Sequence, residues 1–132
     1  MVRLYLAVGL GSALGGGARW LASDLLAGWL GTGSLLGTLF VNVTGSWLIG
    51  LYAALAAPGG RFAAGPLQRH FMMAGVCGGY TTFSVFSLET VRLVEAGRPG
   101  MAAAYVGMSV AGWLAAVWAG YGLGTRVNRA GG

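Results

Sequence analysis

Long apolar segments alternate with short polar connections along this chain. No charged side chain occurs within residues 4–18, 25–60, 71–88 or 101–125. A helix needs about 20 apolar residues to cross the hydrocarbon core of a bilayer, so the pattern predicts four transmembrane helices. We place them near residues 3–22, 34–56, 70–96 and 101–124, as one four-span transmembrane domain over residues 1–132. The predicted fold class is an all-α integral membrane protein.

Composition agrees with a protein embedded in the lipid bilayer. Hydrophobic residues make up 56% of the 132 residues and charged residues only 8%, against about 25% charged residues in soluble domains. The net charge of +5 is spread over single arginines that flank the apolar segments, which favours membrane anchoring over nucleic-acid binding. The glycines of the first segment and the Arg19-Trp20 pair at its end favour a retained helix over a cleaved signal peptide.

Basic residues divide unevenly between the two sides of the predicted bundle. Four spans put both termini on one side, and this side holds Arg3, Arg61, Arg69, Arg126 and Arg129. The other side holds Arg19, Arg92 and Arg98. Because short basic loops tend to stay in the cytoplasm, the difference is a weak bias toward cytoplasmic termini, and insertion in both orientations stays open.

Pairs of small residues at four-residue spacing occur in two of the predicted spans. Such pairs let membrane helices approach closely. They serve either the packing of the monomer's own bundle or contacts between subunits, and the pattern does not decide between the two. The pairs are Gly11 with Gly15, Gly120 with Gly124, and Ala103 with Gly107.

Polar side chains inside the second and fourth spans follow a helical period. Thr38, Asn42 and Ser46 are spaced to share one helix face. Such groups either bond across helices or line a pathway, and a mid-span asparagine favours the functional interpretation. In the fourth span, Tyr105 and Ser109 have the same spacing and could extend this polar face.

The third span combines a helix break with a repeated Phe-Ser pair. Phe83 and Phe86 share one face, and Ser84 and Ser87 share the neighbouring face. Aromatic rings have positive edges, so ring edges beside hydroxyl and amide donors suit an anion. The preceding residues 78–82 (GGYTT) are poor helix formers, and a break there frees carbonyl groups that suit a cation. The segment therefore predicts two ions, one transported and one structural.

Three separated blocks make the chain similar to the Fluc (CrcB) family of small bacterial fluoride channels. They are residues 15–20 (GGGARW), 37–46 (GTLFVNVTGS) and 78–87 (GGYTTFSVFS). The resemblance covers essentially the whole chain. It implies an antiparallel, dual-topology homodimer in the bacterial inner membrane, with the third helix broken and two fluoride pores at the subunit interface. It also implies passive export of fluoride that gives fluoride resistance, without a nucleotide.

The same resemblance assigns roles to single residues. Phe83 and Phe86 correspond to an aromatic box around fluoride, Asn42 to a pore asparagine, and Thr38 and Ser84 to nearby donors; Ser87 lies on the same donor face. The carbonyl groups of Gly78 and Thr81 correspond to a structural sodium site shared by both subunits. Arg19 corresponds to a vestibule arginine, and Tyr105 and Ser109 to the start of a polar track in which Trp113 stands where another hydroxyl is expected.

Two other functions are alternatives to a channel. A small drug–proton antiporter also has four spans but needs a buried carboxylate, and we expect Glu89 to lie near a span end, capping a vestibule or pairing with Arg92. A non-transporting assembly subunit would use the polar residues for packing alone. An enzyme is disfavoured because the single histidine, His70, has no evident catalytic or metal-ligating partners in the sequence.

Overall fold

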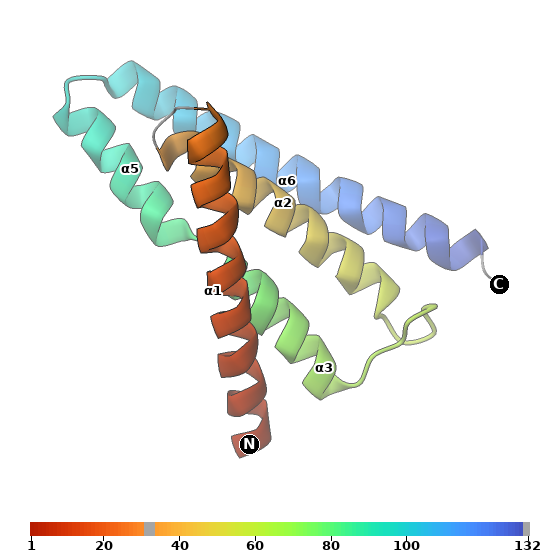
Figure 1. Cartoon of the computed structure of the whole chain (residues 1–132). Coiled ribbons are helices and arrows are strands. Elements are labelled where there is room, and N and C mark those ends of the chain that lie inside the picture. Colours follow the sequence, from red (N-terminus) through yellow and green to blue (C-terminus); the bar gives the residue numbers. More distant parts are fainter. Residues whose placement is uncertain (31–33, 131–132) are drawn as a thin grey trace.

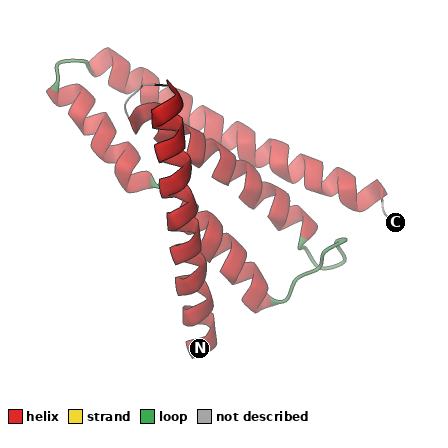
Figure 2. Cartoon of the chain, viewed as in Figure 1, coloured by secondary structure: helices red, strands yellow, loops and turns green. Residues whose placement is uncertain are grey.

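The computed structural model describes residues 1–30 and 34–130, and within them every regular element is a helix (Figure 2). Helix α1 covers Val2–Leu30 and α2 covers Ser34–Leu55. The third segment consists of α3 (Pro66–His70), a π-helical stretch η1 (Phe71–Cys77), α4 (Gly78–Tyr80) and α5 (Phe83–Glu95). The last helix, α6, covers Pro99–Ala130. The expected all-helical class is confirmed.

The third segment is broken at Thr81 and Thr82, as the glycine- and threonine-rich pattern predicted. Thr81 has φ −86° and ψ 161°, and Thr82 has φ −148° and ψ 121°. Both residues are therefore extended between two helical halves. The Thr82 side chain then accepts a hydrogen bond from the Val85 amide and caps the start of α5. The break consequently separates the α3–α4 half from α5 (Figure 1).

A tight turn joins α5 to α6. Gly97 adopts a φ of 71°, the left-handed conformation in which glycine commonly ends a helix. The Arg98 amide donates to the Leu93 carbonyl and the Gly97 amide to the Val94 carbonyl, both at 2.9 Å. Pro99 then opens α6, a position where its missing amide hydrogen costs nothing. The two helices are thereby held as an antiparallel hairpin.

Glycines lie at the main contacts between helices of the chain. Helix α2 lies along α6, and α1 crosses η1 and α4 (Figure 1). A Cβ atom on Gly11 or Gly15 would collide with the backbone of the η1–α4 segment. A Cβ atom on Gly120 or Gly124 would likewise collide with α2. These two pairs thus pack the monomer's own bundle, whereas a Cβ atom on Gly107 would meet no atom of the described residues within 4 Å.

Within the described residues, three helical segments are long and apolar enough to cross a membrane, as judged by length and composition. They are Leu35–Leu55, Pro66–Glu95 and Pro99–Ala130. Helix α1 is 29 residues long, but its glycines and Arg19 lower its mean hydropathy. In Figure 1 the start of α1, the start of α3 and the end of α6 lie toward one end of the molecule, and the α5–α6 turn lies toward the other. The chain is a multi-pass membrane protein.

Candidate functional site

The helix break is held from α2 by the side chain of Asn42. Its Oδ1 accepts from the Thr82 amide at 2.7 Å, and its Nδ2 donates to the Thr82 carbonyl at 2.8 Å. Asn42 is buried, so this pair satisfies two backbone groups that the break would otherwise leave unpaired in the bilayer. One hydrogen of the Asn42 amide has no part in this pair and stays available to an ion.

The same break changes the pairing of two carbonyl groups. In a continuous helix the Thr82 amide would donate to Gly78, and the Val85 amide would donate to Thr81. Here the Thr82 amide donates to Asn42, and the Val85 amide donates to the Thr82 hydroxyl. The carbonyl groups of Gly78 and Thr81 therefore lose their helical donors. Gly78 is exposed on the surface of the chain, and Thr81 is half-buried.

Arg19 reaches this region from α1. Its Nε donates to the Gly79 carbonyl at 3.2 Å. The guanidinium also lines an open cavity of about 500 Å³ together with Asp24, Gly37 and Thr38. Arg19 thus lies between the broken segment and an open cavity beside the start of α2.

Four aromatic rings form a chain from α5 to α6. The ring centroids of Phe83 and Phe86 are 5.5 Å apart. Phe86 also lies 5.3 Å from Tyr105, and 4.9 Å from Trp113 in an edge-on contact at 75°. Phe86 is buried, whereas Phe83 is 70% exposed. The two predicted box residues are therefore neighbours, but one faces the chain interior and the other its surface.

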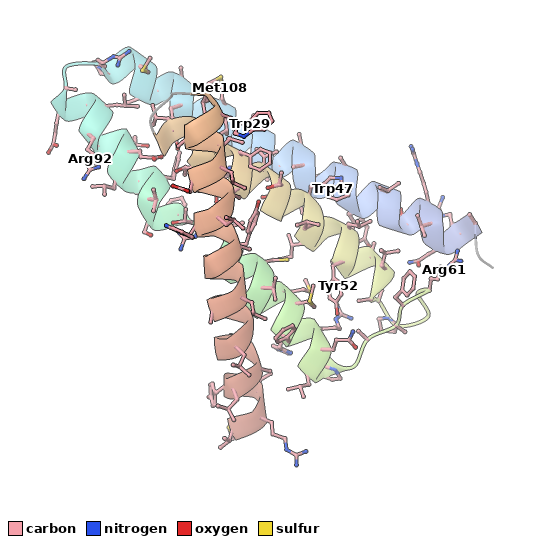
Figure 3. The ribbon with its side chains drawn as sticks, viewed as in Figure 1. Trp29, Trp47, Tyr52, Arg61, Arg92 and Met108 are labelled. Atoms are coloured by element: carbon pink, nitrogen blue, oxygen red, sulfur yellow. The ribbon has the colours of Figure 1, made fainter. Side chains whose placement is uncertain are left out.

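Glu89 is buried next to this aromatic chain, which corrects the expectation for that residue. It is 4% exposed, and it accepts from the Thr38 hydroxyl at 2.9 Å and from the Tyr105 hydroxyl at 2.7 Å. Arg92 extends from the outer side of α5 (Figure 3) and is not its partner. Glu89 repeats the spacing of Phe83 and Phe86 and so lies on their helix face, a regularity in the sequence that could have identified it.

The predicted hydroxyl groups divide into engaged and unpartnered ones. Ser84 Oγ lies 3.2 Å from the Thr82 hydroxyl, and Ser87 donates to the Phe83 carbonyl at 2.9 Å. Ser109 is fully buried, and its Oγ has no hydrogen-bond partner among the described residues; the indole nitrogen of Trp113 is likewise buried and unpartnered there. Unpartnered buried donors are costly in a membrane span, and the Tyr52 hydroxyl is a third such atom.

A second cavity joins the break to the aromatic rings. Its volume is about 230 Å³, and it lies between α2, the third segment and α6. Its polar lining comes from Asn42, Ser46 and the two threonines of the break, and its aromatic lining from Phe83 and Trp113. The site thus presents aromatic rings and uncharged polar groups to one shared cavity. The sequence missed Thr82 as the residue that anchors this arrangement, because its role depends on the Asn42 contact between helices.

Comparisons with known proteins converge on one family. The model of the CrcB-like proteins, described as "Camphor Resistance (CrcB)", matches residues 6–121. "Fluoride-specific ion channel FluC 1" of Rhodopseudomonas palustris is 51% identical over 126 residues, which cover 96% of this chain and 89% of the relative. "Fluoride-specific ion channel FluC" of Opitutus terrae is 48% identical over 118 residues, covering 89% of each chain. The protein of the same name from Rhodospirillum rubrum is 47% identical over 117 residues, covering 89% of this chain and 91% of the relative.

Proposed function

The chain belongs to the CrcB family, and on that premise we propose that it conducts fluoride along the wall formed by Phe83, Phe86 and the polar face of α6. It is a fluoride channel and not an enzyme. The observation that supports this route best is the group of aromatic rings around the buried Phe86, which lies beside unpartnered donors. Because fluoride is small and strongly hydrated, a pore must replace its water with closely spaced donors.

Positive ring edges and uncharged donors suit rapid passage better than full charges. An ion must bind well enough to enter the pore and weakly enough to leave it. In this proposal Arg19 attracts anions at the vestibule, Asn42 supplies its free amide N–H near the break, and Thr38, Ser84 and Ser87 line the route with polar groups. Tyr105 and Ser109 continue the route along α6. Thr38 and Tyr105 both donate their hydroxyl hydrogens to Glu89, so the carboxyl group fixes the positions of these two side chains.

The buried Glu89 is the feature that a proton-coupled antiporter requires. Family membership, rather than the placement of acidic residues, therefore separates the channel from the antiporter. A carboxyl group that accepts two hydroxyl donors is also consistent with a channel, since buried polar groups need hydrogen-bond partners. The antiporter is not retained as a second candidate.

The working unit in this proposal is an antiparallel homodimer. Phe83 is 70% exposed, and a ring whose edge should contact an ion needs a second wall that one chain does not provide. A second copy across the α5 surface would supply it and would create two pores. The weak bias of five arginines against three is compatible with insertion in both orientations. We also assign α1 as the fourth transmembrane span, because its glycines pack directly on the broken segment.

A structural sodium ion on the dimer axis completes the proposal. The carbonyl groups of Gly78 and Thr81 have lost their helical donors, and carbonyl oxygens suit hard cations. Because Gly78 is exposed, its carbonyl can meet the same group of a second copy. Two chains would offer four carbonyl ligands to one ion. The sodium ion would then join the two broken helices.

Export is passive in this account. In acidic surroundings hydrogen fluoride crosses the membrane as a neutral molecule and ionises in the more neutral cytoplasm. The membrane potential then drives the anion outward through a channel in the inner membrane. This direction of flow gives fluoride resistance without a nucleotide.

Anion release from liposomes tests the function. Liposomes that contain purified protein and potassium fluoride should release fluoride when valinomycin provides a path for potassium. Chloride-loaded liposomes with the same protein should stay intact, and protein-free liposomes are the control. Equal release of chloride, or release of neither anion, would contradict a fluoride-selective channel.

A further inference from the structure

The polar face of α6 continues beyond its hydroxyl residues to an indole. Tyr105, Ser109 and Trp113 follow one another at four-residue intervals, so they lie on one face of the helix. The Tyr105 hydroxyl donates to Glu89. The Ser109 oxygen and the Trp113 indole nitrogen are both buried and have no hydrogen-bond partner in the part of the chain that the structure describes. Two consecutive turns therefore present unpartnered donors.

Trp113 also stands at the meeting point of the two parts of the proposed pore. Its ring contacts Phe86 edge-on, with centroids 4.9 Å apart. It further lines the cavity of about 230 Å³ that Asn42 and Phe83 share. It is thus the one aromatic residue of α6 that touches both the buried ring of Phe86 and the cavity at the break.

The chemistry of the indole restricts its partner. An indole N–H is a donor only, with no lone pair to offer. A sodium ion is excluded as its partner, whereas an anion or an oxygen acceptor is suitable. Leaving this donor unpaired inside a membrane span would cost free energy. A passing fluoride ion is the acceptor that the proposed function brings to this place.

We propose that Trp113 donates its indole N–H to fluoride and serves as the far donor of the α6 polar face, in the position of a hydroxyl residue. This inference rests on the proposed pore. Trp113 then acts on the ion directly, and its edge-on contact with Phe86 holds the ring in place. Loss of the donor should slow fluoride passage even when the aromatic packing is retained.

Two substitutions separate the donor from the packing. Trp113→Phe keeps a ring against Phe86 but removes the N–H, and we expect fluoride efflux from liposomes to fall about tenfold or more, since a hydrogen bond to a charged partner is among the stronger ones. Trp113→Ser removes the ring but restores a donor, and should conduct faster than Trp113→Phe. Trp118→Phe is the matched control, because Trp118 lies on the same helix and is 80% exposed. Its efflux should equal that of the wild type.

A packing role for Trp113 predicts the opposite order. If Trp113→Phe conducts like the wild type, or faster than Trp113→Ser, the donor role is overturned. Phe86→Ile in the same assay distinguishes the proposed pore from the proposed role of Trp113. If Phe86→Ile loses fluoride flux while Trp113→Phe keeps wild-type flux, only the indole donor is rejected. Wild-type flux in both Phe83→Ile and Phe86→Ile would reject the pore itself.

A measurement on the wild-type protein covers the case in which Trp113→Phe fails to fold. Protein labelled with ¹⁵N at its tryptophan indoles should show one indole resonance that moves on addition of sodium fluoride and stays in place with sodium chloride. The resonance is assigned by single Trp→Phe variants, or by elimination through the other four tryptophans. A Trp113 resonance that fluoride leaves unmoved would overturn the proposal.

Discussion

Phe86 is the residue on which the proposed conduction route depends most. It contacts Phe83, Tyr105 and Trp113 at once, so it joins the surface ring to the polar face of α6. Of these neighbours, Tyr105 donates its hydroxyl hydrogen to Glu89, and the indole N–H of Trp113 has no hydrogen-bond partner among the described residues. A ring edge there adds positive potential without the strong binding of a full charge.

Replacing either box residue by isoleucine should remove that ring edge while keeping apolar bulk. We expect Phe83→Ile and Phe86→Ile to reduce fluoride efflux about tenfold or more, because each 1.4 kcal/mol added to a barrier slows passage about tenfold. Phe40→Ile is the control, since Phe40 lies on α2 with an exposed side chain. Efflux is measured with a fluoride electrode at equal dimer content. Wild-type efflux in both box variants would remove the aromatic rings from the route.

Individual residues show the limit of reasoning from sequence. The spacing of Phe83 and Phe86 predicted neighbouring rings, and the structure places them together. The burial of Glu89 was not predicted, because it depends on Thr38 of α2 and Tyr105 of α6 arriving from distant parts of the chain. Local spacing fixes a helix face, whereas the partners of that face follow from packing between helices.

The broken third segment is the element that organises the site. Its interruption could be predicted from residues 78–82, since glycine and β-branched residues weaken a helix. The way in which the break is stabilised could not, because Asn42 reaches it from another helix. The π-helical stretch was also not predicted, and its Gly75 lies directly against Gly11 of α1.

Sodium and Asn42 should therefore act together on the dimer. Replacing sodium by N-methyl-D-glucamine should promote dissociation of the wild-type dimer in detergent, because a ligand bound only by the dimer stabilises it. In Asn42→Ala the Thr82 amide can return to the Gly78 carbonyl, so dimer content should fall and lose its sodium dependence. Ser46→Ala, on the same cavity, should retain the wild-type response. A wild-type dimer indifferent to sodium would leave the break as a simple kink.

The whole molecule is a helical bundle in which glycines allow the helix backbones to approach each other closely. Backbone approach at Gly11, Gly15, Gly120 and Gly124 holds α1 on the broken segment and α2 on α6. The sequence alone left these glycines between an internal and an intersubunit role. Family membership and the all-helical class could be predicted from three short blocks and the apolar pattern. Assembly could not, since one chain contains only one wall of the proposed pore.

Dual topology can be measured on the whole protein. In a Cys77→Ser background, Ala130→Cys places a single thiol at the end of α6. A membrane-impermeant maleimide should label about half of the chains in intact cells and all of them after permeabilisation, because antiparallel partners expose their ends on opposite sides. The Cys77→Ser protein alone should remain unlabelled and conduct normally. Labelling of all chains or of none in intact cells would contradict an antiparallel dimer.

The most direct test of the central claim is a reversal potential in a planar bilayer with opposed anion gradients. Fluoride is tenfold higher on one side, chloride is tenfold higher on the other, and potassium is equal on both. A fluoride-selective channel should reverse at about 59 mV with the sign set by the fluoride gradient, the value for a tenfold ratio of a univalent ion. A reversal potential near zero, or one with the sign set by chloride, would contradict the account.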